Sequence, residues 1–178
     1  GVSPLAVDDF LRDGASPLET TLALRDMIAK AIAENESPTI LFGEGPYHVE
    51  APGHEDDILQ IAAVEGLSLL GSESGGTRIV IRNPRQGFLR AIDCCGLKVA
   101  RFLIDYDPLP FTQGEIVRVG ETSFDLRLDK GFPQLGDRNF QSLPHPATRF
   151  GVVMDRRLRT PKAGVLDHLF IDDYTPLG

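Results

Sequence analysis

Two short stretches of this chain, Val64–Leu70 and Cys94–Ala100, read Val-Glu-Gly-Leu-Ser-Leu-Leu and Cys-Cys-Gly-Leu-Lys-Val-Ala, and their Gly-Leu pairs lie 30 residues apart. A β-like run, Arg78–Arg82, lies between them, and another, Arg101–Asp105, follows the second copy. Short apolar strands at a fixed period are typical of a solenoid, in which stacked coils bury an inner face that one coil could not bury alone. The stretch 58–107 therefore predicts about two or three coils of a parallel β-helix.

A helix is predicted directly upstream of these coils. Ser16 can cap the helix, Pro17 suits the first helical position, and Glu19 completes a capping box. The helix should end near Asn35, before Pro38. Its apolar residues recur at the spacing of one helical face, and they are Leu24, Met27, Ile28, Ala31 and Ile32. This face either covers the open end of a core, which we favour, or docks a partner.

Short strands flank the helix. Leu5–Phe10 is predicted as one strand, and Thr39–Val49 as two strands around the corner Gly43–Pro46. The glycines supply the positive φ that a sharp bend requires. A phosphate-binding loop is the other interpretation, but it would need a helix directly after the glycines.

The segments Asp9-Phe10, Thr20-Thr21 and Thr39–Val49 together resemble the N-terminal cap of the pectate-lyase-like right-handed parallel β-helix proteins. The chain departs from that pattern, because Phe10 is followed by Leu-Arg rather than Gly-Ala and the corner Gly43–Pro46 replaces a Pro-x-Gly turn. The resemblance covers residues 5–107. It implies that the helix closes the first coil of the stack.

The segment Ile104–Gly114 carries the candidate site. Asp105 and Asp107 are two residues apart, so on a strand they project from the same face. Paired carboxylates are the groups that glycosidases use, and we take these two as catalytic candidates. The alternative is structural, with Asp107-Pro108 in a turn and Asp105 bonded to the loop backbone. Tyr106 and Gln113 are the substrate-binding candidates.

This segment also resembles the β-helical exo-α-1,3-galactosidases and their uncharacterised relatives. The resemblance implies glycoside hydrolysis of galactose-containing or related polysaccharide, outside the cytoplasm, in the extracellular space or the periplasm. It places the family's catalytic acids on later coils, with no counterpart in these 178 residues. We therefore expect an N-terminal part of a longer protein that is inactive by itself. A non-catalytic glycan-binding or surface-attachment module is the alternative.

The pattern changes after residue 111. Glu115–Val119 and Ser123–Asp129 form an alternating hairpin, and Phe150–Asp155 and His168–Asp172 are predicted as further strands. Antiparallel strands do not stack as solenoid coils. We therefore divide the chain into 1–111, the cap helix and first coils, and 112–178, a small antiparallel β-barrel or sheet inserted in or appended to the β-helix.

Composition limits the partners. The net charge is −8 and the pI about 4.9, whereas nucleic-acid binders usually present a basic face. No apolar run is long enough for a membrane span. Neither nucleic acid nor a membrane is therefore expected as a partner. His54–Asp57 could bind a metal, and Arg156–Lys162 could bind an anion, but a solvated loop and a hairpin tip are the favoured interpretations. Carbohydrate and the remainder of the β-helix, from the same or another chain, are the expected partners, with no cofactor or metal.

Overall fold

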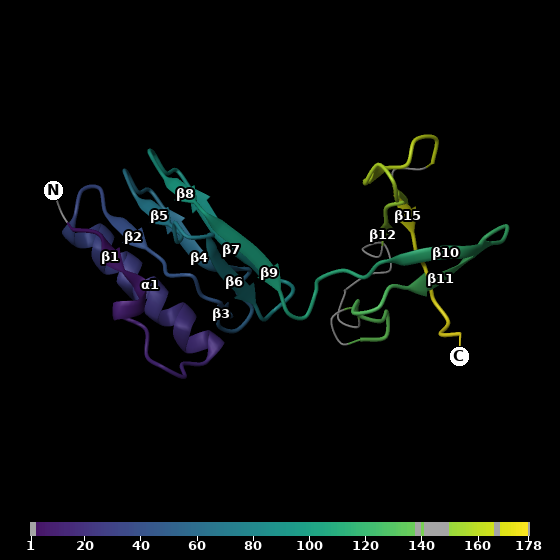
Figure 1. The fold of residues 1–178 in the computed structure, drawn as a ribbon, viewed down its shortest axis with the longest axis horizontal. Helices are drawn as coiled ribbons and strands as arrows, with labels where there is room; N and C mark the ends of the chain where they lie inside the picture. Colours follow the sequence, from purple (N-terminus) through teal and green to yellow (C-terminus); the bar gives the residue numbers. More distant parts are fainter. Residues whose placement is uncertain (1–2, 138–139, 141–149, 166–167, 178) are drawn as a thin grey trace. The chain divides into compact units, whose positions relative to one another are not determined.

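The computed structural model describes residues 3–137, 140, 150–165 and 168–177. The chain is mainly β with one α-helix (Figure 1), and it divides into two compact units, Gly1–Pro110 and Phe111–Gly178. The first unit contains α1 (Pro17–Glu34), a short 3-10 helix η1 (Val7–Asp9) and nine strands. These strands are β1 (Leu5–Ala6), β2 (Thr39–Leu41), β3 (Tyr47–Val49), β4 (Asp57–Ala62), β5 (Ser68–Leu70), β6 (Thr77–Ile81), β7 (Gly87–Ile92), β8 (Lys98–Ala100) and β9 (Phe102–Tyr106).

Parallel pairing organises the first unit. Its strands form three sheets in the orders β1-β2-β5-β8, β3-β6-β9 and β4-β7, and every pairing within them is parallel. From β2 onward, consecutive strands of a sheet are separated by strands of the other two. The chain therefore visits each sheet in turn before it returns to the first.

The predicted 30-residue spacing is observed in the strand register. Leu69 of β5 pairs with Val99 of β8, and a separate bridge joins Glu65 to Cys95. Gly66 and Gly96 adopt φ of +73° and +65° at the same corner of successive turns. A positive φ costs a glycine less than any residue with a side chain, so the repeated Gly has a backbone reason.

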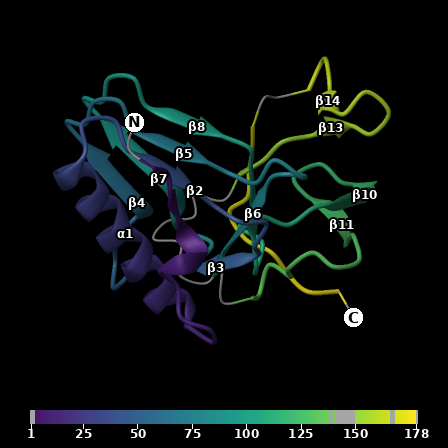
Figure 2. The ribbon, with the colours of Figure 1, turned by 60° about the vertical axis from the view of Figure 1, so that its left-hand side comes forward.

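Helix α1 follows the prediction at both ends. Ser16 is the N-cap and forms a capping box with Glu19, Pro17 begins the helix, and Asn35 is the C-cap. The predicted apolar stripe is buried, apart from the partly buried Ile32. The helix lies against β3 and β4. Figures 1 and 2 show it beside the first strands of the stack, with β8 and β9 farther from it. The apolar face of α1 therefore covers the hydrophobic core, which is the interpretation favoured from the sequence.

The core occupies only the first turns of the stack. Inner side chains of successive strands lie one above another, so that Ile40 pairs with Leu69 and both are fully buried. Exposure rises at the last strands: Val99, on the same row, is 42% exposed, and Ile104, which pairs with the fully buried Ile79, is 43% exposed. In the described part of the chain, β7, β8 and β9 each have a partner strand on one edge only.

One sequence expectation needs correction in this unit, and one strand pairing was missed. The strand expected over Leu5–Phe10 is limited to Leu5–Ala6, because the backbone turns into η1 and the amides of Phe10 and Leu11 both donate to the Val7 carbonyl. The pairing of β4 with β7 was not predicted. Its strands follow acidic and Pro-containing loops and lack the Gly-Leu signal of the repeat.

The second unit is antiparallel. Strands β10 (Gly114–Val119) and β11 (Phe124–Leu128) form the predicted hairpin, with a register shift between Ile116 and Arg118. Strand β12 (Phe150–Gly151) pairs with β15 (Leu169–Phe170), and β13 (Met154–Asp155) pairs with β14 (Thr160–Pro161). Among the described residues these pairs remain three separate two-stranded sheets. A closed barrel and an insertion both stay predictions.

Candidate functional site

The two candidate carboxylates lie at the last strand of the β3-β6-β9 sheet. Asp105 is on β9, where it pairs in register with Val80 of β6, and Asp107 lies in a bend directly after β9. Each contacts an arginine from the preceding turn. Arg78 Nη2 donates to Asp105 Oδ2 at 2.8 Å, and Arg82 Nη1 donates to Asp107 Oδ2.

Strand alternation separates inner from outer side chains on this sheet. Ile79 and Ile81 are fully buried in the core, whereas Arg78, one residue earlier, is exposed; Val80, which pairs with Asp105, is also buried. On β9, Phe102 packs against the core and Leu103 is 59% exposed. We call the exposed side chains on the outer face of β6, of β9 and of the residues directly after these two strands the outer row, and it consists of Arg78, Arg82, Leu103, Asp105 and Asp107.

The arginine contact sets the charge state of Asp105. The hydrogen bond from Arg78, and then the one from the Tyr106 backbone amide, hold the pKa of the Asp105 carboxyl below its ordinary value. Asp105 is therefore ionised and partnered in the fold. A glycosidase general acid needs the opposite, a raised pKa that keeps the proton until it is delivered. The geometry suits Asp105 for accepting hydrogen bonds from a ligand and not for donating a proton.

The two substrate-binding candidates make structural contacts. Tyr106 pairs with Ile81 on the inner row, and its hydroxyl donates to the Gln86 carbonyl oxygen at 2.9 Å. Gln113 belongs to the second unit, where its Nε2 donates to Asp129 Oδ2 at 3.0 Å beside the β10–β11 hairpin. Tyr106 lies next to Asp105 only because the two residues are consecutive in the sequence. Gln113 lies in the second unit.

Sequence reasoning missed a buried polar residue next to this sheet. Gln86 is 2% exposed, and its side chain bridges consecutive turns of the stack. Its Oε1 accepts from the Ala51 amide at 2.9 Å, and its Nε2 donates to the carbonyls of Ala51 at 3.1 Å and Glu55 at 2.9 Å. A Gln that follows Asn83-Pro84 reads as loop, so no local signal in the sequence marks it.

The loops for which metal and anion binding were considered make contacts within the chain. Glu55 pairs with Arg25 of α1, whose guanidinium also donates to the carbonyls of Asp57 and Ile58. No group of three or more His, Cys, Asp or Glu side chains in the described ranges is placed to hold a metal ion. The basic segment is the exposed tip of the β13–β14 hairpin, where Asp155 accepts from two of its backbone amides.

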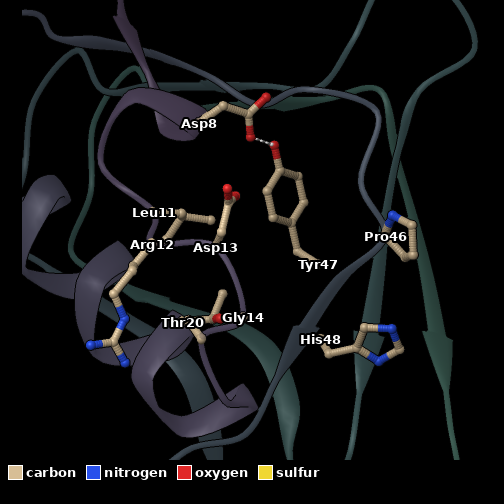
Figure 3. Close-up of a pocket in the computed structure, with 10 residues that line it drawn as sticks. Asp8, Leu11, Arg12, Asp13, Gly14, Thr20, Pro46, Tyr47 and His48 are labelled. Carbon is tan, nitrogen blue, oxygen red and sulfur yellow. Dashed lines mark hydrogen bonds between the residues drawn. The ribbon is translucent and has the colours of Figure 1, made fainter.

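A pocket of about 320 Å³ lies at the start of the chain (Figure 3). Its centre is Tyr47, whose hydroxyl donates to Asp8 Oδ1 at 2.5 Å and accepts from the Gly43 amide at 2.8 Å. Burial, and then the hydrogen bond to Asp8, raises the pKa of Tyr47 well above its ordinary value, so the ring stays neutral. The lining residues come from η1, the loop before α1, α1 itself and β3, and they are Asp8, Leu11, Arg12, Asp13, Gly14, Ala15, Thr20, Pro46, Tyr47 and His48.

Comparison of the chain with protein-family models, with curated proteins and with solved structures found no match. The resemblance to pectate-lyase-like proteins and to exo-α-1,3-galactosidases thus stays a prediction. Within the described residues, no helix combines the length and the apolar character that crossing a bilayer requires.

Proposed function

We propose that residues 1–111 form the start of a right-handed parallel β-helix that α1 caps. Three parallel sheets, in which paired strands from β2 onward lie 25 to 32 residues apart, support this proposal, because a coil of that length visits each sheet once. The cap resemblance over Leu5–Val49 supports it too. Residues 112–178 are then the antiparallel β insertion or appendage of that β-helix.

The proposed function is that of a carbohydrate-active protein, the N-terminal part of a glycoside hydrolase acting outside the cytoplasm on galactose-containing or related polysaccharide. The observation that carries it is the outer row, because charged pairs beside an exposed Leu103 on a parallel sheet can bind an extended sugar chain. Ionised carboxylates and guanidinium groups hydrogen-bond sugar hydroxyls strongly. The resemblance of Ile104–Gly114 to the galactosidases supplies the substrate class.

The chemistry would then lie outside this segment. Asp105 and Asp107 are both bonded to arginines, and the lowered pKa of Asp105 does not suit a general acid. Hydrolysis would need further coils that supply the acid and its partner. The remainder of the β-helix, from the same or another chain, is the partner that this proposal requires.

The same arginine contacts favour a second candidate, a glycan-binding module without catalysis. A carboxylate held ionised by an adjacent guanidinium is a fixed acceptor, and a fixed acceptor recognises a sugar without transforming it. In this reading Asp105 and Asp107 orient the glycan while arginines provide donors. The two candidates differ in turnover and not in binding.

Binding and hydrolysis are separated by measuring both on one variant. The protein and its Asp105→Asn variant are applied to an array of galactose-ended oligosaccharides, and affinity for the best glycan is titrated. Losing a charged acceptor should lower affinity roughly tenfold, the usual value of a hydrogen bond to a charged group. Asp26→Asn, an exposed acid on α1, is the matched control and should bind as the original protein does.

The outcomes distinguish the candidates. Binding without release of galactose favours the module, and turnover by the chain joined to its further coils favours the hydrolase. Absence of both binding and turnover on every glycan contradicts the carbohydrate proposal. A loss in Asp26→Asn equal to that in Asp105→Asn removes the outer row as the site.

A further inference from the structure

Strand β9 ends its sheet with one open backbone edge, to which no described strand pairs (Figure 1). At the ends of its pairing with β6, the Arg101 carbonyl accepts from the Thr77 amide, and the Asp107 amide donates to the Ile81 carbonyl. Backbone groups alternate between the two edges of a strand, so those of the even-numbered residues of β9 face away from β6. These residues are Phe102, Ile104 and Tyr106.

The open edge is apolar as well as unpaired. Ile104 is 43% exposed, although Ile79, its neighbour in the preceding turn, is fully buried. Leu103, on the outer face of the same strand, is 59% exposed. The Tyr106 amide is bonded to Asp105 Oδ1 at 2.8 Å, a contact that a side chain makes where another strand would lie. An exposed apolar strand edge is a template for pairing with another chain.

The inner residues of β9 are symmetrical in kind about Ile104, with an aromatic residue two positions to either side. A two-fold axis at Ile104 would therefore pair all five residues of β9 with those of a second copy in antiparallel register. Phe102 would lie opposite Tyr106 of the second copy, and Ile104 opposite Ile104. In this register the amides and carbonyls of the two open edges bond to each other, and the inner rows become continuous.

The charges at the two ends of β9 are complementary in the same register. Arg101 precedes the strand and Asp107 follows it, so each Arg101 would lie toward Asp107 of the other copy. Both side chains are accessible, at 38% and 65% exposed. An axis at Asp105 would instead oppose two like charges, which is unfavourable. An axis at Leu103 would leave Tyr106 outside the paired strand.

We propose that this chain forms a two-fold symmetric dimer in which the β9 edges of two copies pair antiparallel. A two-fold interface uses the same surface twice, and the symmetry of β9 meets that requirement. The edge is also where further coils of the proposed β-helix would add a strand, so those coils and a second copy would compete for it. The dimer does not depend on glycan binding, and the two proposals are tested separately.

Sedimentation equilibrium of the full chain in glycan-free buffer measures the association. The mass should rise with concentration from 19.5 kDa toward twice that value, with a Kd on the order of 10 µM. Ile104→Lys places two lysines opposite each other at the axis and should weaken the dimer at least roughly tenfold. Leu103→Lys, the same change on the outer face, places each lysine opposite Asp105 of the other copy. This matched control should dimerise at least as tightly as the original chain.

Charge reversal provides a second test that leaves the inner row unchanged. Arg101→Glu places an acid toward Asp107 of the other copy and should weaken the dimer roughly tenfold. Adding Asp107→Arg restores opposite signs and should recover most of the affinity. Circular dichroism shows whether each variant keeps the α1 signal, so a loss of dimer is separated from a loss of fold.

Three results overturn the proposal. The first is a chain that stays monomeric up to roughly a hundred times the expected Kd. The second is a folded Ile104→Lys variant that dimerises as tightly as the original chain or as Leu103→Lys, since association would then use another surface. The third is a loss in Arg101→Glu that Asp107→Arg does not recover, or no loss in Arg101→Glu at all.

Discussion

Arg78 and Asp105 join neighbouring turns of the stack, but both side chains are largely exposed, at 57% and 44%. Solvent weakens such a pair to about 1 kcal/mol or less. Because the pKa of Asp105 is lowered in the fold, its contribution is present above the unfolded value of 3.8 and disappears as the pH falls below it. We expect Asp105→Asn to lower the free energy of unfolding by less than about 1 kcal/mol near neutral pH.

Urea unfolding of the original protein and Asp105→Asn, at neutral pH and again below 3.8, measures this contribution. The difference between the two proteins should shrink toward zero on the acid side and in high salt, which screens exposed charges. A difference that grows as the pH falls would mean that the Asp105 carboxyl is bound more strongly when protonated.

Gln86 contrasts with Asp105, because its side chain is 2% exposed and its three hydrogen bonds are buried or partly buried. In Gln86→Leu the Ala51 amide and two carbonyl groups would lose their partner, and each orphaned buried group costs about 1–3 kcal/mol. We expect a loss of about 3 kcal/mol or more in denaturant titration. Gln60→Leu, at an exposed position on β4, is the control and should change the free energy of unfolding by about 0.5 kcal/mol or less.

At the scale of the element, α1 is the clearest test of end-capping. Ile28 is 5% exposed on the face against the sheets, and Leu22 is 44% exposed on the same helix. Ile28→Asp buries a carboxylate without a partner and should cost about 3 kcal/mol or more, whereas Leu22→Asp should cost about 1 kcal/mol or less. Thermal unfolding followed by circular dichroism compares them. Equal melting temperatures would place the Ile28 face in solvent.

The elements also show which features a sequence can predict. Ser16, Pro17 and Glu19 act within one helical turn, so the start of α1 was predictable to the residue. The 30-residue repeat was predictable because Gly66 and Gly96 satisfy a local backbone requirement. Gln86 and the arginine partners of Asp105 and Asp107 were not predictable, because their contacts depend on the register between turns. A one-residue change of register would place other side chains opposite them.

At the scale of the whole molecule, burial is uneven between the two units. The buried side chains lie between Val7 and Gln86, and no described residue from Phe111 onward is buried. A two-stranded antiparallel pair is at best marginally stable alone. We therefore expect residues 1–110 expressed alone to keep their helix and unfold cooperatively, and residues 111–177 alone to lack a cooperative transition. Circular dichroism melts of both fragments check this, and a sharp melt of the second would reveal a core that its described residues do not show.

One side of the strand stack is covered by α1 and the last strands have open edges, so the stack can form in one direction, from the first strands to the last. Helix α1 covers the side of the first strands, while β7, β8 and β9 leave a backbone edge open in the described part of the chain. Each strand from β5 to β9 pairs with one made 25 to 32 residues earlier, as Phe102 does with Thr77 and Ile79 with Tyr47. The growing chain thus meets a finished template behind it. Folding can keep pace with synthesis, turn by turn, and the earliest residues set the register for every later one.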